Sequence, residues 1–132
     1  MNHYIIMFII MLLSGFLSTM NVMVDKYQDI RFSLNDLYMT LYMTGWMFLF
    51  MGLFYKETNI CLIGLLLVVV NLWCIRRQFM INEKQYLLGM IPHHSMAVHM
   101  SKQLLHKKNN INKFIKNIII NQENEIKLMK GN

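Results

Sequence analysis

The segment YIIMFIIMLLSGFLSTMNVMV, from Tyr4 to Val24, contains no charged side chain. A bilayer core needs roughly 20 apolar residues in a helix, because each residue adds only about 1.5 Å of length. The segment has neither the basic start nor the small-residue cleavage site of a secretory signal peptide. It therefore predicts a transmembrane helix that the mature protein keeps.

Two further uncharged segments follow the first. LYMTLYMTGWMFLFMGLFY, at residues 37–55, carries aromatic side chains near both ends, as an interfacial belt would. A polar turn, KETN, then leads into the short segment ICLIGLLLVVVNLWCI, after which Arg76 and Arg77 can extend their charged ends to the interface. We expect an integral, multi-pass membrane protein with spans at about residues 4–24, 37–55 and 60–75.

Composition agrees with this division of the chain. Hydrophobic residues make up 55% of the sequence and charged residues only 15%, which is too apolar for an ordinary soluble domain of 132 residues. Residues 1–75 hold three basic and four acidic side chains, whereas residues 76–132 hold ten basic and three acidic ones. The sequence predicts an oily membrane domain at 1–78 and a basic domain at 79–132.

The basic domain has the pattern of two helices. NEKQYLLGMIPHHSMAVHMSKQLL is followed by a break at KKNN, and apolar residues then recur every three or four positions from Ile111 to Met129. Two helices with a short link form an antiparallel hairpin. A hairpin of about 50 residues buries too little surface to be stable alone, so it needs the membrane, a partner or a metal. The predicted fold class is all-α.

Soft metal ligands gather on one face of each predicted helix. Positions three, four and seven apart share a helix face, which groups Met90, His93, His94 and Met100 on the first helix, and Glu125 and Met129 on the second. Thioethers suit Cu(I), imidazole suits copper and zinc, and the absence of cysteine from this set argues against structural zinc. Pro92 either kinks the first helix or stands in its first turn. The pattern predicts a site for copper, or for silver as its soft analogue.

A metal-free interpretation of the same residues stays open. Methionine is a common gap-filler in protein cores, and the chain contains 14 of them. Under this interpretation Met90, Met100 and Met129 are core residues and the histidines are interfacial. The stripe Met39, Met43, Met47 and Met51 in the second span is more typical of helix packing than of an ion path.

The motif MIPHHSMAVHM, preceded by Tyr86 and followed by Gln122-x-x-Glu125-Ile126-x-x-Met129, resembles the ferritin-like family known as domain of unknown function 305, and a subgroup of it with three N-terminal transmembrane helices. The resemblance implies a copper- or silver-binding helical unit, in which the hairpin is half of a ferritin-like four-helix bundle that a homodimer or higher homo-oligomer completes. The implied metal ligands are Met90, His93, His94, Met100, Glu125 and Met129. This chain departs from the family pattern at Glu83, where aspartate is usual.

Several function classes follow from these patterns. The leading hypothesis is a membrane protein that buffers or handles Cu(I), and the alternative is a structural membrane protein whose hairpin is a metal-free dimerisation module. The lysines of the basic domain could bind anionic lipid or nucleic acid, but they fit a solvated helix face better. No organic cofactor or enzymatic activity is expected, since the sequence has no nucleophile–base set and no nucleotide fingerprint. The basic bias favours a cytoplasmic hairpin, whereas copper-handling relatives usually face outside, so the side stays open.

Overall fold

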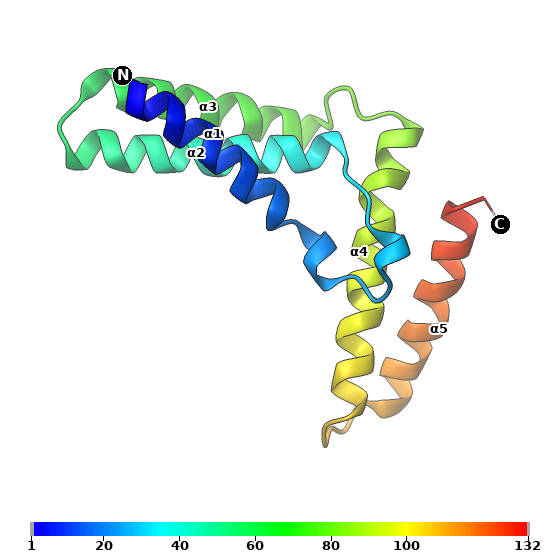
Figure 1. The fold of residues 1–132 in the computed structure, drawn as a ribbon. Coiled ribbons are helices and arrows are strands. Elements are labelled where there is room, and N and C mark those ends of the chain that lie inside the picture. Colours follow the sequence, from blue (N-terminus) through cyan, green and yellow to red (C-terminus); the bar gives the residue numbers. More distant parts are fainter. Residues whose placement is uncertain (1, 132) are drawn as a thin grey trace. The chain divides into compact units, whose positions relative to one another are not determined.

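The computed structural model describes residues 2–131, and every regular element within that range is a helix. The all-α prediction is therefore confirmed. The helices in chain order, shown in Figure 1, are α1 (Asn2–Leu17), η1 (Met20–Met23), η2 (Tyr27–Asp29), α2 (Leu34–Phe54), α3 (Thr58–Arg77), α4 (Glu83–Leu105) and α5 (Asn112–Met129).

These elements form two compact units that are not contiguous in sequence. The first unit comprises the chain up to Ser18 together with Leu34–Ile81, and the second comprises Thr19–Ser33 together with the chain from Asn82 onward. The sequence predicted one boundary, at residue 78. In the structure, the connection between the first two apolar segments also packs with the C-terminal helices and belongs to their unit. We call this connection, Thr19–Ser33, the strap.

Within the described residues, three stretches are long and apolar enough to cross a bilayer by length and composition, namely His3–Met23, Leu34–Phe54 and Thr58–Arg77. The first stretch is not one α-helix, however, because α1 ends at Leu17 and the short helix η1 follows. The Thr19 side chain accepts a hydrogen bond from the backbone N–H of Asn21, which caps the new helix. The Asn21 amide in turn pairs with both backbone groups of Arg31, at 2.8 and 3.0 Å, and so closes the strap on itself.

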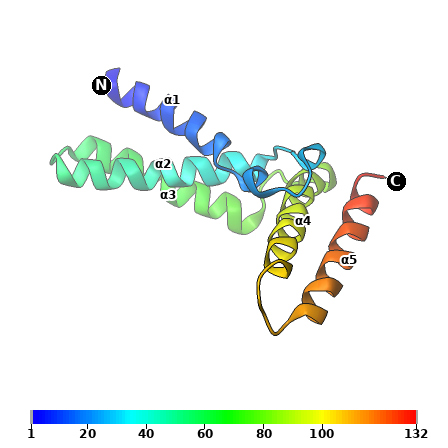
Figure 2. The same ribbon diagram turned by 60° about the horizontal axis from the view of Figure 1, so that its bottom comes forward.

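In the first unit, α2 and α3 lie side by side along most of their length (Figure 2). Glycines permit this close approach. A Cβ at Gly45 would lie 2.8 Å from the backbone nitrogen of Val68, and one at Gly52 would lie 2.6 Å from that of Cys61. The two backbones therefore touch, as small residues allow in membrane helix pairs.

Helix α1 adds a smaller contact to this pair. Tyr4 packs with Phe48 of α2 and Ile60 of α3 in a buried cluster. Its hydroxyl donates a 2.7 Å hydrogen bond to the Glu57 carboxylate in the turn between α2 and α3. Most other side chains of α1 are exposed, among them Ile5, Ile9 and Leu13.

In the second unit, α4 and α5 run side by side and are joined by a short turn (Figures 1 and 2). Their buried apolar contact consists of Ile91, Val98 and Ile126, with Ile119 and Met129 packed against it. This is a small core for two helices of 23 and 18 residues. The strap lies against α4 and supplies the polar contacts described below.

Candidate metal site

Helix α4 carries the motif that the sequence singles out. The Asn82 side chain caps its start by accepting from the backbone N–H of Gln85 at 3.0 Å. The helix then runs from Glu83 to Leu105 without interruption, with Pro92 buried in its interior. Of the two alternatives for Pro92, the position in a first helical turn is therefore excluded. Because proline has no N–H, the carbonyl of Leu88 loses its intrahelical partner.

One open pocket of about 250 Å³ lies between α4 and α5. It is lined by Met90 and His94 from α4 and by Glu125 and Met129 from α5, with Tyr86 and Leu128 completing the wall. Each ligand pair is four residues apart, which places its two members on one helix face. Four of the six predicted ligands therefore share one cavity.

His94 is the most constrained member of this group. Its ring is buried, and its Nδ1–H donates a 3.0 Å hydrogen bond to the backbone carbonyl of Met90. The other ring nitrogen, Nε2, lies 2.6 Å from a carboxylate oxygen of Glu125. A histidine whose Nδ1–H is held by a carbonyl presents Nε2 in a fixed direction, as metal-binding histidines usually do. Glu125 is half exposed and has room to move aside or to share a ligand.

The structure does not bring His93 and Met100 into this pocket. The His93 ring is exposed, and its Nδ1 lies 3.3 Å from the sulfur of Met20 in η1. The rings of His93 and His94 are 6.0 Å apart between centroids and tilted by 69°. Met100 is 51% exposed. Adjacent residues differ by about 100° around a helix, so the two imidazoles diverge.

Met20 is a contact that sequence reasoning missed. It lies in the first apolar stretch, where a methionine is expected to face lipid or a neighbouring helix. The break after Leu17 places it in the strap instead, next to α4. The paired methionines of η1, Met20 and Met23, were the only local signal.

The donor set of the pocket fits a soft ion. Within residues 2–131, no three His, Cys, Asp or Glu side chains come together as a hard or borderline metal would require. The pocket offers one imidazole, one carboxylate and two thioethers, so any metal held there would need the sulfurs of Met90 and Met129. Sulfur and imidazole together favour Cu(I) over Mg²⁺ or Ca²⁺.

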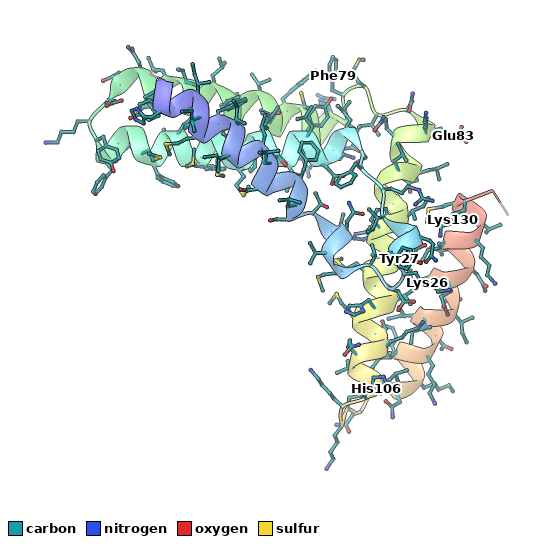
Figure 3. The ribbon with its side chains drawn as sticks, in the orientation of Figure 1. Lys26, Tyr27, Phe79, Glu83, His106 and Lys130 are labelled. Atoms are coloured by element: carbon teal, nitrogen blue, oxygen red, sulfur yellow. The ribbon has the colours of Figure 1, made fainter. Side chains whose placement is uncertain are left out.

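A polar network behind His94 holds the strap, α4 and the end of α5 together. The fully buried Ser95 hydroxyl donates to the Asp29 carboxylate at 2.6 Å and accepts from the backbone N–H of Asp25 at 2.8 Å. Lys130, one residue after Met129, donates to the second oxygen of Asp29. Figure 3 shows Lys130 close to Lys26 and Tyr27 of the strap. The network thus fixes the residues next to two of the four ligands.

Charge balance in this network is favourable at neutral pH. Burial by itself would raise the pKa of the Asp29 carboxyl, but the hydrogen bonds from Lys130 and Ser95 and the charges of Lys130 and Lys26 outweigh it and lower that pKa. The hydrogen bond to Asp25, at 2.9 Å, raises the pKa of Lys102 against the opposing effect of burial. Asp29 therefore stays ionised under physiological conditions.

Comparison with known proteins gives two findings. Residues 78–132 match the family model described as "Domain of unknown function (DUF305)", and this range contains all six predicted ligands. The chain is also similar to "Uncharacterized protein L153" of Acanthamoeba polyphaga mimivirus, at 40% identity over 135 residues that cover 96% of this chain and 88% of the viral protein. No solved structure matches the chain significantly.

Proposed function

We propose a function for this chain on the basis that it belongs to the DUF305 family. It is a multi-pass membrane protein whose C-terminal helices bind Cu(I), or Ag(I) as its soft analogue. In this proposal the second unit is a ferritin-like half-bundle that buffers the ion at the membrane. The observation that carries the proposal is the convergence of Met90, His94, Glu125 and Met129 on one pocket.

Membrane insertion is supported by the exposed apolar surface. On α1, Ile5, Ile6, Ile9, Ile10 and Leu13 are each more than half exposed. Apolar surface of this extent is rare on a water-soluble monomer and normal against lipid. Three polar side chains within α2 and α3 are satisfied inside their own helix, as lipid requires: Thr40, Thr44 and Asn71 each donate at 2.8 Å to the carbonyl four residues earlier.

Chain connectivity requires that α2 and α3 either both cross the bilayer or both stay out of it. The strap precedes α2, and α4 follows α3, so the strap and α4 lie on the same side only if both helices cross the bilayer or neither does. Ser95 of α4 is hydrogen-bonded to Asp29 of the strap, so the two segments do share one side. A single crossing by only one of the two helices is incompatible with this contact.

Copper binding is tested by titrating the purified, detergent-solubilised chain with Cu(I) against a competing chelator under anaerobic conditions. Loss of one direct ligand should weaken binding at least as much as loss of a supporting residue, which is about 10- to 100-fold. We therefore expect at least a tenfold loss in His94→Ala and in Met90→Leu/Met129→Leu. Leucine keeps the methionine volume, so the second variant removes sulfur with little change in packing.

Matched controls come from the same helix. His99→Ala and Met100→Leu alter a histidine and a methionine of α4 that do not line the pocket, and both should bind Cu(I) like the unmodified chain. Equal affinity in the control and the pocket variants would reject this site. Binding that depends on His93 and Met20, and not on His94, would move the site to the η1 side of α4.

One observation favours the alternative, a metal-free dimerisation module. Apolar side chains are exposed along α5, including Phe114 at 62% and Leu128 at 74%. A second copy packed on α5 would cover them and complete a four-helix bundle. Light scattering in detergent with excess chelator separates the two ideas: a dimer that is unaffected by Cu(I) and lost in Phe114→Ser supports the module, whereas assembly only with Cu(I) supports the metal site.

A further inference from the structure

A larger pocket in the second unit is not used by the proposed metal site. It has a volume of about 750 Å³ and lies between the strap, the start of α4 and the end of α5. Its polar wall contains Arg31, Lys84 and Lys130, and its apolar wall contains Leu87, Leu88 and Ile91. In Figure 3, Glu83 marks the start of α4 and Lys130 the end of α5. The volume is within the range of pockets that hold small ligands.

The charges of this pocket suit an anion. The charge of Lys130 is already matched by Asp29, which leaves Arg31 and Lys84 against the carboxylate of Glu83, so the lining is net positive. Arg31 is held in place by its Nη1, which donates to the carbonyls of Gln28 at 2.6 Å and Ile30 at 2.8 Å. A guanidinium carries five donors in a planar fork, so an Arg31 anchored at Nη1 keeps donors for a phosphate. The surrounding unit, with ten basic and five acidic side chains, also attracts anions.

The apolar wall points to an anion that carries hydrocarbon. Leu87 and Leu88 are half-buried and Ile91 is buried, so apolar side chains line the same pocket as the cations. A free phosphate or nucleic-acid backbone would gain nothing from these apolar side chains. A phospholipid has a phosphate next to its glycerol and acyl chains, and it matches both walls.

Chain connectivity keeps the pocket close to the proposed bilayer. Arg31 lies three residues before the start of α2 at Leu34, which limits the separation to about 10 Å. Lys84 lies seven residues after the end of α3 at Arg77, which limits that separation to about 25 Å. If α2 and α3 span the membrane, Arg31 is within reach of the headgroup region. This step rests on the membrane part of the proposed function and is independent of copper.

We propose that this pocket binds an anionic phospholipid. Arg31, Lys84 and Lys130 hold the phosphate, and Leu87, Leu88 and Ile91 contact the glycerol and the first carbons of the acyl chains. The net positive lining selects a headgroup such as phosphatidylglycerol over zwitterionic phosphatidylcholine. Met129 lines both this pocket and the candidate metal site, so the two sites share a wall.

The test is native mass spectrometry of the full chain in a non-ionic detergent, titrated with phosphatidylglycerol, phosphatidylcholine or glycerol 1-phosphate. We expect phosphatidylglycerol to bind at least about tenfold more tightly than either of the others, since charge-assisted hydrogen bonds contribute on this scale. Equal binding of the two lipids would overturn anion recognition. Comparable binding of glycerol 1-phosphate would show a site for soluble phosphates and would overturn the lipid assignment.

A pair of charge-matched variants locates the site. Arg31→Gln/Lys84→Gln should weaken phosphatidylglycerol binding roughly tenfold or more, whereas Lys107→Gln/Lys108→Gln, which removes two charges from the turn between α4 and α5, should not. Lys130 is left intact because it also holds Asp29. Equal effects of the two pairs would overturn the pocket. Extraction of the chain from membranes by alkaline carbonate would reject the spans themselves, so the two failures are distinguishable.

Discussion

The two units differ in how closely their helices pack and in where their polar bonds lie. In the first unit, α2 and α3 meet through glycines, and Thr44 and Asn71 inside these helices bond only to the turn before them. A longer-range bond, from Tyr4 to Glu57, lies at the turn between α2 and α3. In the second unit, the apolar core is small, and polar bonds join residues far apart in sequence, as between Asp29 and Ser95. Close backbone packing and hydrogen bonds within one helix suit lipid, whereas the second unit depends on a buried polar network between distant residues.

The largest effect is expected from removing the centre of the polar network. Asp29→Ala leaves Lys130 and Ser95 without their shared acceptor, and breaking a buried ion pair costs about 3 kcal/mol of unfolding free energy or more. Hydrogen exchange should show faster exchange in α4 and α5 and unchanged exchange in α2 and α3. Equal loss of protection in both units would contradict the separation between them.

A smaller loss of stability, confined to the first unit, is expected from a substitution at the glycine contact between α2 and α3. A Cβ at Gly64 would clash with the backbone of Leu49 and Gly45, so Gly64→Ala should destabilise the α2–α3 pair by about 1–3 kcal/mol. Gly89→Ala in α4 is the matched control. Its Cβ would meet only the Ser33 side chain, at 3.4 Å, so the gain in helix propensity should stabilise α4 by up to about 1 kcal/mol. Thermal unfolding in detergent measures both signs, and the same sign for both variants would contradict the packing.

A pH titration sharpens the comparison further. The pKa of Asp29 is lowered in the folded chain, so its ionised form stabilises the second unit above the ordinary carboxyl pKa of 3.8, and this contribution is lost as the pH falls through the lower folded value. Exchange protection of α4 should therefore fall in acid more steeply than that of α3. Asp29→Asn should flatten this dependence, and an unchanged slope in that variant would show that another group is responsible.

The smallest effect is expected at the rim of the network. Lys102 donates to Asp25 at 2.9 Å and lies 3.7 Å from Glu123, but its side chain is 39% exposed. Ion pairs at such positions contribute about 0–1 kcal/mol, so Lys102→Gln should reduce stability by less than about 1 kcal/mol. Urea unfolding of the second unit, followed by hydrogen exchange, checks this value. A loss as large as that in Asp29→Ala would mean that the whole network acts as one cooperative unit.

Helical spacing on α4 and α5 predicted six ligands, and four of them line the pocket. Spacings of four placed Met90 with His94 and Glu125 with Met129, and the structure brings these four to one pocket. The same spacing also predicted His93 and Met100 as ligands. Residues three, four and seven apart cover a broad face of α4, and α5 contacts only part of that face. His93 instead meets Met20, whose place depends on a break in the first apolar stretch after Leu17.

The sequence by itself determined the helical class and the three long apolar stretches, because hydropathy and helical spacing are local properties. It also determined which residue types are available for a soft metal. Only the tertiary structure decided that the strap packs with α4 and α5 and that Asp29 is buried between Ser95 and Lys130. Those features depend on contacts between residues 66 to 101 positions apart, and no local pattern encodes such a distance.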